Sequence, residues 1–308
     1  MKKKYKNILI LVILLSFLII NFISIDTNII KIIDYTILFF KKIFPVSFIF
    51  LTLSNLLIEY NLIQILQRLF RIKSPYIYVF ILSLISGFPS GAIYIKELLE
   101  KEIISIKDAN KLIMFSHFPN PLFVINSIGY ILNSKVSALI ILLSIIVSNS
   151  IIMLFCCKHS NNTFIKFNYN NKDFSDILSN TVYKTIKTIV LIYGLSLFFY
   201  LISIIINNLF NNIYIYVFIS GVFDLTYGVY STKLLSNNII KELLIMFFIS
   251  FGPISIHFQT KSILANTHVN YKKYLIGRII GCLISIIFFY SVIKLKLNVP
   301  FLLEGITG

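Results

Sequence analysis

Asp224 is the residue of this chain whose type and setting most suggest chemistry. It lies in Ser220–Gly228, SGVFDLTYG, directly after an apolar run. A carboxylate in apolar surroundings is costly unless it is paired, protonated or facing a wet cavity. We therefore expect Asp224, with the nearby Thr226, to bind a coupling proton or Na⁺. The alternative is a capping or interfacial aspartate at a helix end.

Two histidines occupy similar settings, since His117 and His257 each lie close to a proline element and each precede a Phe. Either could hydrogen-bond a solute or move protons near neutral pH. A buried structural histidine is the alternative in both cases. The predicted substrate-binding residues are Ser86, Gly87, Pro89, Ser90, Gly91, Ser116, His117, Asn120, Pro121, Ser255, His257 and Gln259.

Prolines in the same stretches predict where helices restart. Helix N-termini that follow Pro89, Pro121 and Pro253 would point their positive dipole ends toward an anion. These prolines therefore favour a small anionic substrate, with a nucleoside-like solute as the alternative.

Nothing in the sequence indicates an enzyme. It contains no HExxH motif, no Cys/His pair with an orienting acid and no phosphate-binding loop. The cysteines Cys156, Cys157 and Cys282 lie in apolar runs without metal-ligand spacing. We expect no catalytic residue, no metal and no cofactor.

Composition shows which elements must position these residues. The 308 residues are 57% hydrophobic with a mean hydropathy of +0.88, which suits lipid rather than water. The net charge of +16 comes from basic residues between apolar runs. That arrangement is typical of cytoplasmic loops that meet anionic lipids, and it argues against nucleic-acid binding. The sequence predicts an all-α polytopic membrane protein.

Continuous apolar runs are few. Those long enough to cross a bilayer are Ile8–Ile25, Val136–Cys157, Ile186–Ile206 and Tyr274–Leu295. We interpret the first, which follows MKKKYKN, as an uncleaved helix with a cytoplasmic N-terminus.

Other apolar runs are short or interrupted. Pro45–Ile58 is short, and Gly, Pro and polar residues break Tyr76–Tyr94, Leu112–Leu132, Ile213–Tyr230 and Leu243–Phe258. Unpaired backbone groups are not tolerated in lipid, so these breaks predict re-entrant or discontinuous helices. Simple proline kinks are the alternative. We expect about seven to nine membrane segments.

The polar connectors predict further elements. The charged stretch Lys96–Lys111 has one apolar stripe and predicts an interfacial helix, and Leu66–Lys73 is a shorter basic version. The predicted domains are a first membrane half at 1–157, a polar connecting loop at 158–184 and a second half at 185–308.

An internal repeat would relate these halves. Ser86-Gly87 precedes a polar connector, the residues Leu-Ile-Met-Phe and then Pro121. The same order follows Ser220-Gly221 and ends at Pro253. This shared order predicts two related halves.

The stretch Ser86–Gly129, SGFPSGAIYIKELLEKEIISIKDANKLIMFSHFPNPLFVINSIG, resembles the YlbJ family of sporulation integral membrane proteins, also called stage V sporulation protein SpoVV. The similarity rests on a Ser-Gly-Phe-Pro-x-Gly-Ala element and on Phe115 followed by Asn120-Pro121-Leu122-Phe123. Gly252–Ile263 resembles the family's Gly-x-Ser-x-x-x-Gln element through Ser255 and Gln259. Asp224 stands where the family usually carries Glu, which shortens the reach of the carboxylate.

This resemblance implies the nucleoside-recognition "gate" class, related to concentrative nucleoside transporters. It implies transport of dipicolinic acid toward the forespore across the outer forespore membrane of the mother cell. The alternatives are a nucleoside or other small-metabolite carrier of the same fold, and a non-transporting sporulation membrane scaffold. The sequence leaves the oligomeric state open, an oligomer included.

Overall fold

The computed structural model describes residues 8, 11–12, 15–19, 25–60, 75–157 and 173–298. Every regular element within these ranges is a helix. Within the described residues, five helices are long and apolar enough to cross a membrane: Asn28–Glu59, Lys135–Cys156, Phe174–Asn207, Asn238–Ile263 and Tyr271–Lys294. The prediction of an all-α membrane protein is confirmed at this level.

The first of these spans is longer than the sequence suggested. Helix α2 (Ile25–Leu38) continues through the π-helix η1 (Phe39–Ile43) into α3 (Phe44–Glu59). The prediction of a short segment at Pro45–Ile58 was wrong, because Pro45 lies in the first turn of α3, where a missing N–H is tolerated.

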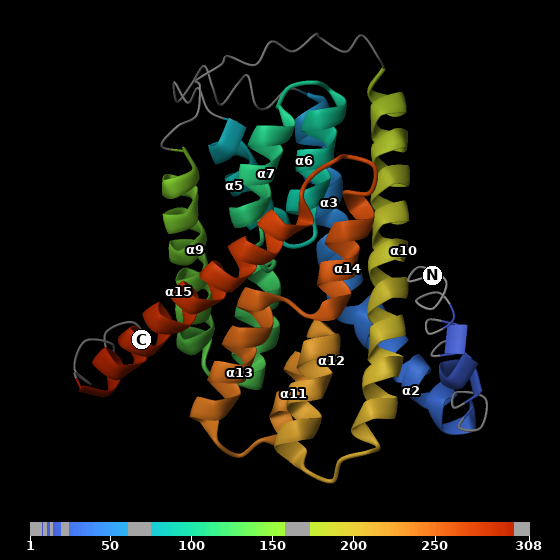
Figure 1. Ribbon diagram of the computed structural model, residues 1–308, viewed down its shortest axis with the longest axis vertical. Coiled ribbons are helices and arrows are strands. Elements are labelled where there is room, and N and C mark those ends of the chain that lie inside the picture. Colours follow the sequence, from blue (N-terminus) through green and yellow to red (C-terminus); the bar gives the residue numbers. More distant parts are fainter. Residues whose placement is uncertain are drawn as a thin grey trace.

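A helical hairpin follows. Helices α5 (Pro75–Ser86) and α6 (Ser90–Glu100) pack against each other and lie toward the upper end of Figure 1. The tip lies between them, where Gly87 has φ +77°, a conformation that favours glycine. The break predicted here therefore turns the chain back on itself.

The charged stretch after this hairpin is not one helix. Helix α6 ends at Glu100, and α7 (Ile106–Phe115) begins after a turn. The prediction of an interfacial helix over Lys96–Lys111 was wrong because a capping box, in which Ser105 and Asp108 exchange hydrogen bonds, starts a new helix. Burial tends to raise the pKa of Asp108, but the hydrogen bonds from Ser105 and Tyr76 outweigh it and lower the pKa.

Helix α7 leads into the second break. The chain is non-helical from Ser116 to Asn120, and the helix resumes at Pro121. It continues as the π-helix η2 (Phe123–Ile128) and α8 (Gly129–Ile131). Helix α9 (Lys135–Cys157) then runs back along the molecule (Figure 1).

The long helix α10 (Phe174–Asn207) leads to a second hairpin, formed by α11 (Ile213–Phe223) and α12 (Leu225–Ser231). This hairpin lies at the lower end of Figure 1, opposite the first. Its legs pack closely, since a Cβ on Gly228 would lie 2.1 Å from the Cα of Gly221. The short 3₁₀ helix η3 (Thr232–Leu234) follows.

The last break separates α13 (Asn238–Phe251) from α14 (Ile254–Ile263) at Gly252-Pro253. Gly252 has φ +88°. Helix α14 continues toward the upper end, and α15 (Tyr271–Asn298) crosses the molecule obliquely back toward the lower end (Figure 1).

Two predictions concern the middle and the N-terminal side of the chain. The polar loop predicted at 158–184 is shorter, because α10 already begins at Phe174. The predicted helix at Leu66–Lys73 lies outside the described residues, as does much of the predicted span Ile8–Ile25.

Candidate functional site

One cavity lies where the chain breaks meet. It has a volume of about 70 Å³, room for several water molecules. Both hairpin tips and both broken helices contribute to it, together with η1, α3 and α10. Its lining comprises Phe39, Lys42, Ile43, Val46, Ser47, Ser86, Phe88, Asn120, Phe123, Ile192, Ser196, Leu225, Thr226, Ile256 and Gln259.

The first hairpin tip packs directly on the first broken helix. A Cβ on Gly87 would lie 2.5 Å from the backbone nitrogen of Asn120. The side chain of Asn120 accepts hydrogen bonds from the N–H groups of Leu122 (2.9 Å) and Phe123 (3.3 Å). It also donates to the carbonyl of Ser86 at 3.4 Å. Asn120 therefore caps the helix that resumes at Pro121 and ties it to the hairpin.

The remaining predicted residues of this region lie behind the lining. Ser90 and Ser116 are buried, and a Cβ on Gly91 would lie 2.1 Å from the carbonyl oxygen of Ser116. Pro89 precedes the first residue of α6. These residues pack the hairpin against the break, whereas Ser86 and Asn120 line the cavity.

Asp224 occupies the tip of the second hairpin and is 1% exposed. Its carboxylate caps α12 by accepting a hydrogen bond from the N–H of Tyr227 at 2.9 Å. The other carboxylate oxygen accepts a 3.5 Å hydrogen bond from the hydroxyl of Ser255. Asp224 is thus a capping residue, and its neighbours Leu225 and Thr226 line the cavity.

Helix α14 contributes Gln259 to the lining. Its side-chain amide donates to the Ser196 hydroxyl at 3.1 Å and to the Ile192 carbonyl at 3.4 Å. Gln259 therefore holds α14 to α10 across the cavity.

Among the described residues, three helix N-termini contribute to the lining of this cavity. They belong to the helix that resumes at Pro121, to α12 and to α14. Asn120 and Asp224 cap the first two, whereas α14 begins without a side-chain hydrogen bond at the cap. Helix N-termini carry positive partial charge and unpaired N–H groups, so this arrangement suits a negatively charged group.

Sequence reasoning missed the contribution of η1. Lys42 lines the cavity and, with Val46 and Phe123, also borders an adjoining cavity of about 250 Å³. The available signal was the basic pair Lys41-Lys42 inside an otherwise apolar stretch. Two aromatic side chains, Phe39 and Phe88, line the same cavity.

The two histidines lie outside the lining. His117 is 3% exposed, stacks on Phe88 at a ring-centroid distance of 4.8 Å, and its Nδ1 pairs with the Tyr274 hydroxyl at 3.1 Å. The Nδ1 of His257 pairs with the hydroxyl of Tyr271 at 2.7 Å. His117 therefore supports a wall of the cavity through Phe88.

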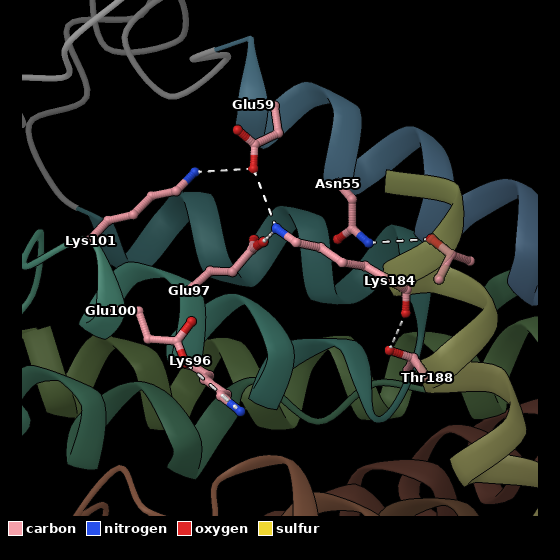
Figure 2. Close-up of polar contacts among 9 residues, drawn as sticks. Asn55, Glu59, Lys96, Glu97, Glu100, Lys101, Lys184 and Thr188 are labelled. Carbon is pink, nitrogen blue, oxygen red and sulfur yellow. Dashed lines mark hydrogen bonds and ion pairs between the residues drawn. The ribbon is translucent and has the colours of Figure 1, made fainter. Parts of the chain in front are cut away.

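The upper ends of three elements are joined by ion pairs (Figure 2). Lys184 of α10 lies 3.6 Å from Glu59 of α3 and 3.4 Å from Glu97 of α6, and Lys101 lies 3.5 Å from Glu59. Burial raises the pKa of Glu97, although Lys184 and Lys101 oppose this shift. A cavity of about 380 Å³ lies beside these pairs, bordered by Lys96, Lys184 and Lys187 among others.

Among the described residues, no group of three or more His, Cys, Asp or Glu side chains could hold a metal ion. Comparison with known proteins adds no family: no family model, no curated protein and no solved structure matches the chain.

Proposed function

We propose that this protein is a transporter of a small organic anion. The observation that carries the proposal is the convergence of three helix N-termini on one cavity. Lys42 adds a positive charge, and the rings of Phe39 and Phe88 offer faces for a flat solute. A flat aromatic dicarboxylate fits these features, so dipicolinic acid is the favoured substrate. The outer forespore membrane, and membership of the YlbJ family, are parts of the same proposal.

The order of elements supports alternating access. In the first part of the chain, a hairpin enters from the upper end, a broken helix runs downward and α9 returns (Figure 1). In the second, the hairpin enters from the lower end, the broken helix runs upward and α15 returns. We propose that these are two inverted repeats, which would rock against each other around the cavity.

Charge suggests how the protein is oriented. The upper ends of α6, α7, α10 and α15 carry Lys96, Lys101, Lys107, Lys111, Lys184, Lys187, Lys272 and Lys273. Basic residues favour the cytoplasmic face. We propose that the upper end faces the cytoplasm, and a cytoplasmic N-terminus remains part of that proposal.

A nucleoside or similar neutral metabolite is the second candidate. One observation favours it: the Asp224 carboxylate lies beside the cavity wall and could accept hydrogen bonds from a donor-rich solute. An acidic residue at this place would repel an anion unless it were protonated or paired with a coupling cation. The two candidates therefore differ in the role of Asp224.

The test is the dipicolinic acid content of sporulating cells that lack the protein, measured separately in mother cells and spores. The proposal predicts acid that is made but left in the mother cell, with transfer restored by the wild-type gene. Asn120→Ala, present at normal membrane levels, should fail to restore it. Normal spore acid in the deletion strain would refute dipicolinate as the substrate.

Gly194→Ala is the matched control, because a Cβ on Gly194 of α10 meets no atom within 4 Å. It should restore transfer fully. If Asn120→Ala also restores it fully, the cavity is not the route, and a scaffold role becomes the better account.

A further inference from the structure

In the part of the chain that the structure describes, Arg278 of α15 is a second charged side chain, besides Asp224, that is buried in the interior. It is 1% exposed, and no carboxylate of the described residues pairs with it. A buried guanidinium without an acid partner is costly, so other groups must compensate its charge.

Helix ends supply that compensation. One guanidinium nitrogen donates to the carbonyl of Met114 at 2.7 Å, and another donates to the carbonyl of Ser250 at 3.4 Å. Met114 is the next-to-last residue of α7, and Ser250 is the next-to-last residue of α13. The C-terminal ends of both broken helices, which carry negative partial charge, therefore meet at one cation.

Two further contacts complete the surroundings. The Oδ1 of Asn149 accepts a 3.2 Å hydrogen bond from Arg278, while its Nδ2 donates to the carbonyl of His117 at 2.8 Å. The guanidinium carbon also lies 5.8 Å from the centre of the Tyr274 ring. The groups around the guanidinium are thus three neutral oxygens and an aromatic ring, and each of these is a favourable partner for a cation.

In many secondary transporters, the C-terminal ends of half-helices and unwound carbonyls coordinate a transported Na⁺. We propose that Arg278 is a built-in cation that holds this place permanently, so that no coupling ion binds where α7 and α13 meet. Arg278 is then a positioning residue. It fixes the first half of each broken helix, and thereby the second halves that border the cavity.

This proposal needs no substrate and stands or falls separately from the proposed function. The test uses the purified full chain in detergent micelles, with thermal unfolding followed by circular dichroism. Arg278→Lys keeps the charge, whereas Arg278→Gln keeps N–H donors without charge. The exposed Lys273→Gln, on the same helix, is the control and should unfold at the wild-type temperature.

We expect Arg278→Lys to be more stable than Arg278→Gln. Arg278→Ala would leave three oxygens around an empty cation position. It should therefore be stabilised by a few degrees in millimolar sodium, potassium or guanidinium chloride relative to choline chloride, and wild type should not.

Either of two results overturns the proposal: Arg278→Gln at least as stable as Arg278→Lys, or Arg278→Ala indifferent to small cations. If the alanine variant does not fold, the order of the lysine and glutamine variants decides the matter alone.

Discussion

Asp224 and Arg278 are both buried charges held by helix ends, but they are held in opposite ways. Asp224 lies at the N-terminus of α12, where its carboxylate accepts a backbone N–H. Arg278 lies at the C-termini of α7 and α13, where it donates to backbone carbonyls. Each charge is therefore stabilised by the dipole of the helix end that it meets.

The two buried charges differ in how close they lie to the cavity and in how many groups they contact. Residues adjacent to Asp224 line the cavity, and Ser255 reaches the carboxylate only at 3.5 Å. Arg278 has several closer or comparable partners on three elements and does not line the cavity. We propose that the Asp224 carboxylate changes its partners during the proposed transport cycle, whereas Arg278 holds α7 and α13 in place.

The largest effect should come from removing the charge of Arg278. Arg278→Gln loses hydrogen bonds donated by a charged group, each worth about 1.5–3 kcal/mol, so we expect a loss of about 3–5 kcal/mol of stability. Thermal unfolding and the yield of folded protein measure this. If Arg278→Gln were nearly as stable as wild type, the contrast with Asp224 would fail, because Arg278 would then contribute no more to stability than a surface residue.

A smaller effect should follow from filling the contact next to Arg278. A Cβ on Gly277 would lie 2.3 Å from the carbonyl oxygen of Met114. Gly277→Ala should therefore cost about 1–3 kcal/mol by overpacking α15 against α7.

The matched variant for this prediction is Gly194→Ala in α10, which meets nothing within 4 Å. It should be neutral or slightly stabilising, because alanine favours a helix over glycine by up to about 1 kcal/mol. Equal effects of the two variants would contradict the view that α15 packs tightly against α7 at Gly277, because Gly194 lies on an exposed face of α10.

In contrast to Arg278, a change at Asp224 should lower the solute flux more than the stability of the fold. Asn is as good a helix cap as Asp, so Asp224→Asn should fold normally while solute flux falls about tenfold, or about 1.4 kcal/mol in the barrier. Uptake and membrane levels are measured together. If the flux were unchanged in Asp224→Asn and fell only in Asp224→Ala, Asp224 would act only as the N-cap of α12.

The ion pairs at the upper end should contribute least to stability. Lys184→Gln should change the free energy of unfolding by about 0–1 kcal/mol, because the Lys184 side chain is half exposed and such pairs are weak.

The pH dependence at this end has a defined sign. Because burial raises the pKa of Glu97, the folded state holds its proton more tightly than the unfolded state. The contribution of Glu97 therefore increases the free energy of unfolding as the pH falls toward the ordinary glutamate range, and decreases it as the pH rises. Glu97→Gln should remove this dependence, and melting curves over that pH range would detect it. An unchanged pH dependence would assign it to other groups.

The sequence located the breaks in the helices but not the groups that meet behind them. Gly87, Pro121 and Gly252-Pro253 interrupt helices through local backbone chemistry, and the structure breaks at these places. The capping box at Ser105 was equally local and was overlooked within a stretch whose apolar stripe suggested one helix.

The contact between Arg278 and Met114 joins residues 164 positions apart, so it depends on the packing of α15 against α7. The place of Lys42 on the cavity depends in the same way on how η1 meets the breaks. No spacing in the sequence predicts either. Local signals gave the ends of the elements, and long-range packing decided which side chains share a site.

Uptake of dipicolinate into proteoliposomes tests the central claim most directly. Vesicles containing the purified protein and loaded with terbium(III), whose luminescence rises when dipicolinate binds, would report arrival of the acid. The account predicts saturable uptake by wild type and by Gly194→Ala, and uptake reduced about tenfold in Asp224→Asn. Uptake no faster than in protein-free vesicles, with the same protein shown to be folded, would contradict it.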